Sequence, residues 1–561
     1  MKLKLTFIFF IYCIAILLYA QDTNTVENIN ETEDMDISAR NQDNESVRVA
    51  NDTTSHTGAV STGYGTVKKE DLTVFVDHID LENTESMAIA NVERMLQGKA
   101  CGVFAASGSG APNAPVSVRI HGIGTPNNAE PLYIIDGMPV DEIHFWTNEN
   151  PQGLSFLSPG DIESIQVLKD ASACAMYGIR GANGVVIINT KKGNKGKPVI
   201  HFNGYFGNQR MPQNQRHELL NGQEFATLYN EATGVDIFDP ATISSLPTTD
   251  WQGEIFRVAP IHNALLSLSG GSGMGNYYMS FNKFLQKGII KHSGYNRYTF
   301  RINSEYQVSD WLRMGEFISL SNSKNRSQME RSLNGPVGAA LQADTTASVH
   351  DDDPDTDWAP MLNTPQIPNP VGVIERQHNI YTSNRIQGSA FAEIDFGGIA
   401  DFLEHLKYKL NAGLSRSWGN NEELQPAFYE SPVIASSSSI KIIRQEDLNN
   451  FLLEHKLSYN FSIQKNHHFK AIGGYSVQKE KMEWTNITYN ENEDDDIIAS
   501  DTSSAEWKVA SFMSGVHYNF RGKYLLNAAF RHDQSFYFKK KCLRDSFLLS
   551  PGHGKFRKNH S

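Results

Sequence analysis

Residues 157–193 read LSPGDIESIQVLKDASACAMYGIRGANGVVIINTKKG, and this stretch decides the fold of the N-terminal part of the chain. Ile162 to Leu168 is predicted to be a strand. Asp170 is a favourable N-cap for a short helix over Ala171 to Tyr177. Val185 to Thr190 is mostly apolar, which is typical of a central, buried strand. Strand, helix and strand in close succession predict a compact α/β domain.

The same mixture of strand and helix signals begins upstream, at Leu72. Met87 to Gln97 is predicted to be helical, and Gly98 is placed to end that helix. Val116 to Ile120 and Leu132 to Ile135 are predicted to be two further short strands. The α/β domain is therefore expected to occupy most of the region between Leu72 and Lys192.

After Gly193 the pattern changes to alternating apolar and polar residues separated by turns. Leu266 to Ser269 and Tyr277 to Asn282 alternate on either side of a Gly-rich turn and predict a hairpin. Val516 to Phe530, around Arg521-Gly522-Lys523, predicts another. Residues 200–538 leave room for roughly ten to twelve strands of this kind. A membrane barrel with a wet lumen and a soluble β-sandwich both show this period, so the alternation alone does not separate them.

Two long polar stretches interrupt the strands. Ser323 to Arg376 and Glu430 to Gln445 are much longer than hairpin turns. Long loops of this kind are typical of the outer side of membrane barrels.

The N-terminus has the features of a secretory signal. Lys2 and Lys4 precede an apolar run from Leu5 to Ala20, and Leu-Tyr-Ala stands before Gln21. A retained transmembrane helix is the alternative, but the run is short of the roughly 20 residues needed to cross a bilayer. We expect cleavage and export. Residues 21–58 are acidic, polar and free of aromatic side chains, so we expect a disordered periplasmic tail.

Composition excludes one large class of function. The formal net charge of −13 does not suit a general nucleic-acid binder, which needs a basic face to neutralise phosphates. Removal of the signal leaves Cys101, Cys174 and Cys542, an odd and widely spaced set that cannot form a disulfide framework.

Several segments resemble one transporter family. They are APNAPVSVRIHGIGT at residues 111–125, PLYIIDGMPV at 131–140 and the stretch at 157–193. Further similarity runs through TGYGTVKKEDLT at 62–73 and NVERMLQGKACGV at 91–103. It continues, more loosely, through GNYYMSFNKFLQKGIIKHSGYNRYTFRINSEY at 275–306. Together these segments resemble the SusC/RagA family of TonB-dependent outer-membrane transporters.

The resemblance implies a fold and a set of partners. The fold is an α/β plug domain inside an antiparallel transmembrane β-barrel of roughly 22 strands, of which this chain holds the N-terminal part. The implied activity is active import of an oligosaccharide or peptide, energised by the TonB-ExbB-ExbD complex. A SusD-like surface lipoprotein is implied as a lid, and outer-membrane lipid surrounds the barrel. A ferric-siderophore receptor and a non-transporting sensing or interaction remnant are the alternatives.

A TonB contact requires an extended segment that can add as a strand to the edge of a sheet in TonB. The candidate segment lies between the tail and the plug, and an ordinary linker is its alternative. Its residues are Ala59, Val60, Ser61, Thr62, Gly63, Tyr64, Gly65, Thr66, Val67 and Lys68.

The plug resemblance also selects individual residues. They are Arg119, Gly122, Asp136, Gly137, Asp161, Lys169, Asp170, Tyr177, Gly178, Arg180, Asn183 and Gly184. The glycines sit at strand ends and turns, where a positive φ or a close approach of backbone is needed, and Gly178 can supply a left-handed C-cap. The charged members are expected to pair with the barrel wall and to hold the plug while letting it loosen when pulled.

No motif for catalysis stands out, so we expect no enzyme activity and no cofactor. An acidic run, Asp351, Asp353, Asp355 and Asp357, offers oxygen ligands for Ca²⁺, but it lacks EF-hand spacing, and a solvated loop is the favoured interpretation.

The expected organisation is a signal at 1–20, an acidic tail at 21–58, a TonB-box-like segment at 59–70, a plug at 71–198 and barrel strands at 199–538. Residues 539–561 are basic and do not resemble barrel sequence. Lys539-Lys540-Lys541 suggests a slippery run of adenines, so we interpret the tail as the product of a frameshift that truncates the barrel. An unclosed barrel would leave an unpaired strand edge in lipid.

Overall fold

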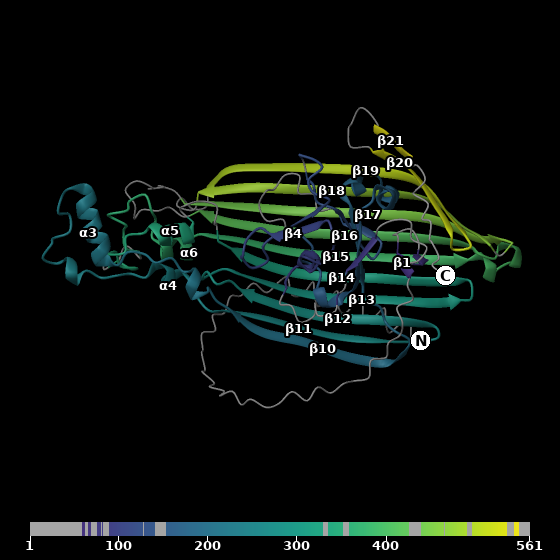
Figure 1. The fold of residues 1–561 in the computed structure, drawn as a ribbon, viewed down its shortest axis with the longest axis horizontal. Helices are drawn as coiled ribbons and strands as arrows, with labels where there is room; N and C mark the ends of the chain where they lie inside the picture. Colours follow the sequence, from purple (N-terminus) through teal and green to yellow (C-terminus); the bar gives the residue numbers. More distant parts are fainter. Residues whose placement is uncertain are drawn as a thin grey trace, which may run out of the picture. The chain divides into compact units, whose positions relative to one another are not determined.

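The computed structural model describes residues 59–61, 66–68, 76–79, 81, 89–126, 128–140, 153–328, 335–351, 358–425, 439–464, 466–490, 496–535 and 543–548 (Figure 1). Within these residues the structure contains an N-terminal plug domain and a large antiparallel sheet, here called the wall. The expected signal and acidic tail lie outside the described residues.

The plug is built around a five-stranded sheet in the order β3-β8-β9-β6-β7. Its strands are β3 (Val76–Ile79), β6 (Leu132–Ile135), β7 (Met138–Val140), β8 (Ile162–Leu168) and β9 (Val185–Thr190). The pair β6–β9 is parallel and the other pairs are antiparallel. A separate hairpin joins β4 (Val103–Ser107) to β5 (Val116–Ile120). The predicted strands at 116–120, 132–135, 162–168 and 185–190 are all confirmed.

The unbroken apolar run of β9 follows from its place in the middle of this sheet. Val186 and Ile188 join the main plug core with Ile165 and Val167. Val185 and Ile187 point to the opposite face, where they form a second cluster that includes Met513 of the wall. Both faces of the strand are covered, so neither set of positions is free to be polar.

The predicted plug helices are shorter and tighter than expected. Where Met87 to Gln97 was predicted to be helical, the structure has only a 3₁₀ turn, η3 (Val92–Leu96), and residues 82–88 lie outside the described part. Asn91, just before this turn, has an extended backbone, and its side chain donates to the Ala114 carbonyl. These contacts prevent an earlier helical start. Gly98 has a φ of 69°, in agreement with its predicted role as a stop.

The helix after β8 also differs from the prediction. α2 (Ala171–Cys174) is a single turn, and the chain continues as the 3₁₀ segment η5 (Ala175–Asn183). The Asp170 side chain does not cap α2. Gly178 has φ 66° and ψ −152°, so it does not adopt the predicted left-handed C-cap. A further 3₁₀ turn, η4 (Pro159–Asp161), leads into β8.

The wall has twelve antiparallel strands that follow one another in sequence order. They are β10 (Gly196–Gln209), β11 (Ala259–Ser272), β12 (Gly275–Lys287), β13 (Gly294–Ser309), β14 (Leu312–Ser327), β15 (His378–Asp395), β16 (Leu406–Gln425), β17 (Ile440–Ile463), β18 (His467–Asn490), β19 (Asp496–Phe520), β20 (Tyr524–Ser535) and β21 (Leu543–Leu548). Both predicted hairpins are confirmed, as β11–β12 and β19–β20.

Two expectations about the wall need correction. β14 runs to Ser327 and β17 begins at Ile440, so part of each predicted loop is strand, because pairing with the neighbouring strands continues past the predicted boundary. The basic tail, predicted to hold no barrel strand, contributes β21, which pairs with β20 from Phe530↔Leu548 to Ser535↔Leu543.

Polar side chains of the wall strands face inward and many large apolar ones face outward, which is the reverse of the arrangement in a soluble protein. On β13 the buried side chains that face the plug are polar, Arg297, Thr299, Arg301 and Asn303. On the other face large apolar side chains are exposed, among them Phe281 of β12 and Phe512 of β19, each about half accessible. A soluble sandwich would bury the apolar set. The structure therefore favours the membrane-barrel interpretation over the sandwich.

Helical segments gather beyond one end of the wall (Figure 1). They are α3 (Gly222–Thr233), α4 (Trp251–Ile255), α5 (Pro336–Gln342) and α6 (Pro370–Arg376), with the 3₁₀ turns η6 (Gln213–Gln215) and η7 (Ile243–Ser245). Two more 3₁₀ turns, η8 (Phe396–Gly398) and η9 (Asp401–Leu403), lie between β15 and β16. α4, α5 and α6 share a core of their own around Trp251, Trp358 and Ile374, and we call this the outer lobe. Among the described residues, no helix is long and apolar enough to cross a lipid bilayer.

The outer lobe is expected to lose stability as the pH falls below about 6.5, the ordinary pKa of histidine. Partial burial and the charge of Arg326 lower the pKa of His292, although the Glu375 carboxylate lies 3.9 Å from its Nε2. With a lowered folded pKa, the unfolded chain takes up the proton first, so acid favours unfolding between the two pKa values. The urea midpoint of the lobe, followed by tryptophan fluorescence, should fall over this window.

His292→Asn is the matched variant, because His292 has a φ of 61° and asparagine tolerates that conformation. It should flatten the pH dependence of the urea midpoint below about pH 6.5. An unchanged slope would show that another group is responsible.

Candidate functional site: the interface between plug and wall

One buried arginine of the wall holds three carbonyls of the plug. Arg297 of β13 is fully buried, and its Nη1 donates to the carbonyls of Ala90, Ser155 and Leu157 at 2.9, 2.7 and 3.1 Å. Tyr295, two residues earlier on the same face, donates to the Ser155 carbonyl at 3.1 Å. These residues fix the start of η3 and the segment before β8 to the wall.

A second buried polar group lies four residues further along β13. Arg301 Nη1 is 3.2 Å from an oxygen of Asp136 and 3.2 Å from Thr190 Oγ1. Asp136 also accepts from the backbone N–H and the hydroxyl of Thr190, and Asn303 donates to Thr190 Oγ1 at 2.8 Å. Asp136 and Gly137 both have positive φ, which makes the tight turn between β6 and β7 and places the carboxylate beside β9.

Asp161 at the start of β8 also contacts the wall. It accepts from the hydroxyl of Tyr278 on β12 at 2.9 Å, and its other oxygen is 3.9 Å from Arg301 Nε. β12 and β13 therefore hold the plug through a polar surface that contacts Asp136 and Asp161.

The far side of the plug is held by β19 and β20. The Arg180 guanidinium lies 5.3 Å from the centre of the Trp507 ring, and Arg531 donates to the Met176 carbonyl. Gly178 has the positive φ that was predicted for the signature glycines, although not as a C-cap. A Cβ at this position would lie 2.0 Å from an oxygen of Asp533 and 2.7 Å from Arg531 Nε, so a larger residue would displace these two wall side chains as well as strain the backbone.

Two signature charges do not pair with the wall, contrary to expectation. Arg119 is bonded to Glu130, and Lys169 Nζ lies 2.6 Å from Asp77, so both ion pairs are internal to the plug. The Arg119–Glu130 pair ties the β4–β5 hairpin to the segment that follows it. The Lys169–Asp77 pair ties β3 to the residue after β8. Asn183 also acts inside the plug, where its amide donates to the Asn128 and Glu130 carbonyls.

The remaining signature residues are structural. Tyr177 is buried in the cluster around Val185 and Ile187. Gly122 and Gly184 have positive φ, and a Cβ on Gly184 would lie 2.6 Å from the Ile120 side chain. Asp170 precedes α2 without capping it.

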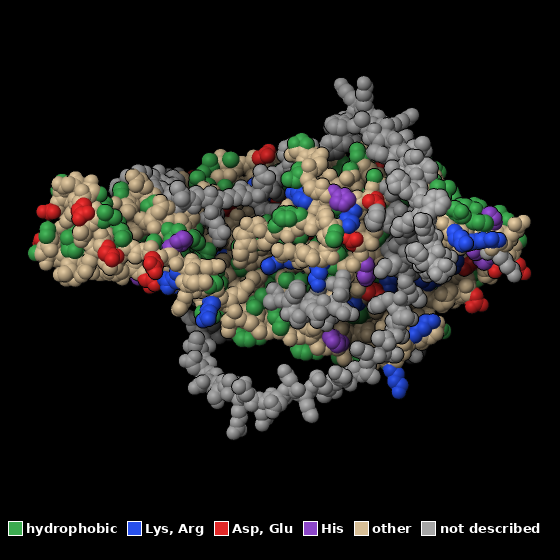
Figure 2. Space-filling view, in the orientation of Figure 1, with side chains coloured by type: hydrophobic (Ala, Val, Ile, Leu, Met, Phe, Trp, Pro, Cys, Tyr) green, Lys and Arg blue, Asp and Glu red, His purple; other side chains and the backbone are tan. Residues whose placement is uncertain are grey.

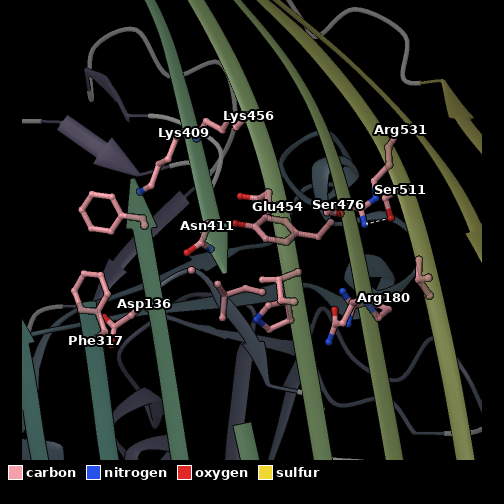
Figure 3. Close-up of a pocket in the computed structure, with 18 residues that line it drawn as sticks. Asp136, Arg180, Phe317, Lys409, Asn411, Glu454, Lys456, Ser476, Ser511 and Arg531 are labelled. Atoms are coloured by element: carbon pink, nitrogen blue, oxygen red, sulfur yellow. Dashed lines mark hydrogen bonds between the residues drawn. The ribbon is translucent and has the colours of Figure 1, made fainter. Parts of the chain in front are cut away.

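A cavity lies between the plug and the wall, bounded by the β6–β7 turn and strands β14 to β20 (Figure 3). Its volume is about 90 Å³, and it adjoins a second cavity of about 190 Å³ that shares Asp136, Phe391 and Lys409 with it. Lys409, Asn411, Glu454 and Lys456 of β16 and β17 point their polar groups to this space, as Figure 3 shows.

The predicted TonB and Ca²⁺ residues are only partly described. Ala59–Ser61 (β1) pairs with Thr66–Lys68 (β2) in a small antiparallel hairpin, while Thr62 to Gly65 lie outside the described residues. Of the acidic run, only Asp351 is described. Within the part of the chain that the structure describes, no three potential ligands lie close enough to hold a metal ion.

The comparisons with known proteins match both parts of the chain. Residues 68–185 match the TonB-dependent Receptor Plug Domain model. TonB-dependent receptor P26 of Formosa agariphila is 30% identical over 500 residues, which are 84% of this chain and 48% of that protein. TonB-dependent receptor SusC of Bacteroides thetaiotaomicron is 32% identical over 368 residues, 61% of this chain and 35% of that protein.

The chain belongs to the SusC/RagA family of TonB-dependent receptors. A solved structure of the RagAB peptide importer in its open-open state superposes with a TM-score of 0.73 at 23% identity, over 87% of this chain and 58% of that chain. The ferric citrate transporter FecA superposes with a TM-score of 0.54 at 12% identity, over 86% of this chain and 60% of that one, and shares the fold alone. The chain spans about half the length of the curated SusC/RagA relatives that it matches. TonB-dependent receptors are outer-membrane β-barrels and not enzymes.

Sequence reasoning missed the wall residues that hold the plug. Arg297, Arg301 and Asn303 stand in the quoted stretch at 275–306, where every second residue of β13 is polar. Two arginines on the buried face of a strand were a usable signal, because buried arginines are almost always paired.

Proposed function

We propose that the chain acts in TonB-dependent import of an oligosaccharide or peptide across the outer membrane. The observation that carries this proposal is the polar surface of β12 and β13, which holds the plug through Arg297, Arg301 and Tyr278. These contacts are polar, so a plug that leaves the wall exposes less apolar surface to water than one held by an apolar core would. A plug held in this way suits a channel that opens when the plug is pulled.

The outer face of the wall supports a place in a membrane. Large apolar side chains are exposed along β10 to β20, including Phe202, Phe281, Phe451 and Phe512. An exposed apolar band of this extent is unfavourable in water and favourable against lipid. We propose that residues 1–20 direct export and are cleaved, and that the wall strands cross the outer membrane repeatedly.

TonB is the proposed source of energy, together with ExbB and ExbD. The segment Ala59 to Lys68 precedes the plug sheet, and its ends form the small hairpin β1–β2. A two-stranded hairpin has marginal stability in isolation, so its strands are available to pair with another chain. We propose this segment as the TonB contact.

Deletion of Ala59 to Lys68 is expected to abolish energised uptake while leaving substrate binding unchanged. The measurement is uptake of a labelled substrate by cells, together with binding to the same protein in isolated outer membranes. Deletion of the same number of residues from the preceding segment, 48–57, is the control and should preserve uptake. Uptake that survives the loss of Ala59 to Lys68 would contradict the assignment.

A SusD-like lipoprotein lid is the proposed partner on the outer side, as the likeness to the RagAB peptide importer suggests. Co-purification with the product of a neighbouring lipoprotein gene tests this. Ferric-siderophore uptake is the second candidate, since siderophore receptors such as PirA share the fold with a TM-score of 0.53. The higher similarity to SusC and RagAB favours import of an oligosaccharide or peptide.

A further inference from the structure

Two lysines of the wall lie directly opposite one another beside the plug. Lys409 of β16 and Lys456 of β17 are paired across the two strands in the antiparallel register. Both line the cavity next to the β6–β7 turn, above Asn411 and Glu454 in Figure 3. Like charges directly opposite each other destabilise a sheet. An anion that sits near both ammonium groups would relieve this repulsion.

The carboxylates around this pair are shared with other cations. Glu393 is opposite Lys409 on the β15 side, but Arg313 Nη2 lies 3.2 Å from it. Glu305 lies 2.7 Å from Lys192 Nζ. The charged side chains that line the two cavities are six cations, Arg180, Lys192, Arg313, Lys409, Lys456 and Arg531, and three carboxylates, Asp136, Glu305 and Glu454. Positive charge is therefore in excess around this space.

Aromatic rings hold the amines in position. Lys409 Nζ lies 4.2 Å from the centre of the Phe391 ring, and Lys192 Nζ lies 5.2 Å from that of Phe317. The two rings are stacked, with centres 6.2 Å apart, and Phe391 is buried. A cation against a ring face is favoured electrostatically. Lys409 is therefore positioned before any ligand arrives, which lowers the entropic cost of binding.

The space beside the lysines suits a small charged group. A water molecule occupies about 30 Å³ of liquid, so a cavity of about 90 Å³ has room for a carboxylate. The larger cavity adjoins it at Lys409 and Phe391, which leaves room for the atoms attached to that carboxylate.

The cavity also borders the attachment of the plug to β12 and β13, because Asp136, the partner of Arg301, lines it. The bonds of Arg297, Arg301 and Tyr278 come from β12 and β13, whereas the cavity is bounded by β14 to β20. Across it, the Asn450 amide on β17 reaches the Pro139 carbonyl at 3.4 Å, which is a long hydrogen bond. At its other border, Arg531 of β20 donates to the Met176 carbonyl, so the cavity lies between two places where the wall holds the plug.

We propose that this cavity binds a carboxylate of an acidic oligomer on its way past the plug, and that Lys409 and Lys456 hold that carboxylate. The inference rests on the proposed import function and narrows its substrate to the acidic class. Acidic peptides and uronic-acid oligosaccharides share the required chemistry. Two ammonium groups give charge-assisted hydrogen bonds that a neutral sugar or peptide cannot accept with equal strength.

Calorimetry on the full chain folded in detergent tests this, with four probes. Triglutamate and trigalacturonate are the acidic probes, and triglutamine and galactotriose are their neutral counterparts. At least one acidic probe should bind about tenfold or more tightly than its neutral counterpart, as the loss of one charge-assisted hydrogen bond predicts. The probe that binds identifies the source of the carboxylate.

Substitutions then locate the site. Lys409→Met and Lys456→Met should each weaken binding of the acidic probe about tenfold, while Lys409→Arg retains it. Lys508→Met is the control, since Lys508 is an exposed wall lysine paired with Glu506 at 2.8 Å. If the methionine variants do not fold, the salt dependence of the wild-type chain decides, because binding to two lysines must weaken as NaCl rises.

Three results would overturn the proposal: equal binding of acidic and neutral probes, acidic binding that survives both methionine substitutions, and acidic binding that salt does not weaken. Because the assay uses no TonB, these results do not bear on import. Acidic binding without energised uptake would contradict the import function and leave the site standing.

Discussion

Arg297→Met is expected to lower the free energy that keeps the plug seated by about 3–5 kcal/mol, since it orphans buried carbonyls and removes a charged donor. Arg297 donates to three plug carbonyls and is fully buried, so water cannot readily replace it. Methionine roughly preserves the packing against Phe284, whose ring centre is 5.5 Å from the guanidinium. Native-state hydrogen exchange at the amides of η3 and β8 measures the change.

Arg416→Met is the matched control for this prediction. Arg416 is also a wall arginine, but its side chain is more than half exposed and pairs with Asp447. An exposed pair contributes at most about 1 kcal/mol, so exchange in the plug should stay as in the wild type. If both variants exchange alike, the plug is held by contacts other than Arg297.

Arg301→Met is expected to destabilise the seated plug by about 3–5 kcal/mol, the cost of breaking a buried ion pair. The change leaves Asp136 without its cation and also removes the positive charge near Asp161. Asp136→Asn alone should also be costly, because Arg301 then keeps only the more distant Asp161. The double variant should recover about 2 kcal/mol relative to the sum of the single changes.

The exposed pair Lys407–Asp395, at 2.8 Å, provides the comparison cycle. Its coupling energy should be well under 1 kcal/mol, because both side chains are accessible to water. Additive effects at Asp136 and Arg301 would show that their 3.2 Å contact does not contribute to seating.

The plug strands could be predicted from the sequence because each is a short segment rich in aliphatic residues between turn residues. Val185–Thr190 agrees with the predicted bounds, since burial on both faces leaves an unbroken apolar run from Val185 to Ile188. Ile162–Leu168 agrees as well, although polar residues interrupt its apolar ones. The extents of the helices were harder to predict from the sequence. Contacts with residues far away in the chain, such as that of Ala90 with Arg297, stop η3 from lengthening, and no local signal reports them.

The partners of the signature charges could not be predicted for the same reason. Asp136 and Arg301 are 165 residues apart, and Arg119 finds Glu130 only 11 residues away. The sequence shows which residues carry charge but not which charge each one meets. The register of β13 decides this, because it turns Arg297 and Arg301 to the same face as Thr299 and Asn303.

The strand order of the plug also determines how it would respond to mechanical load. A force applied near Ala59 passes the small β1–β2 hairpin and then reaches β3, an edge strand that shares four residue pairs with β8. β9, at the centre of the sheet, continues through Lys191 to Lys195 into β10 and is thereby anchored to the wall. Tension between these ends is concentrated on the β3–β8 pairing, so β3 is expected to detach while the centre of the sheet remains folded.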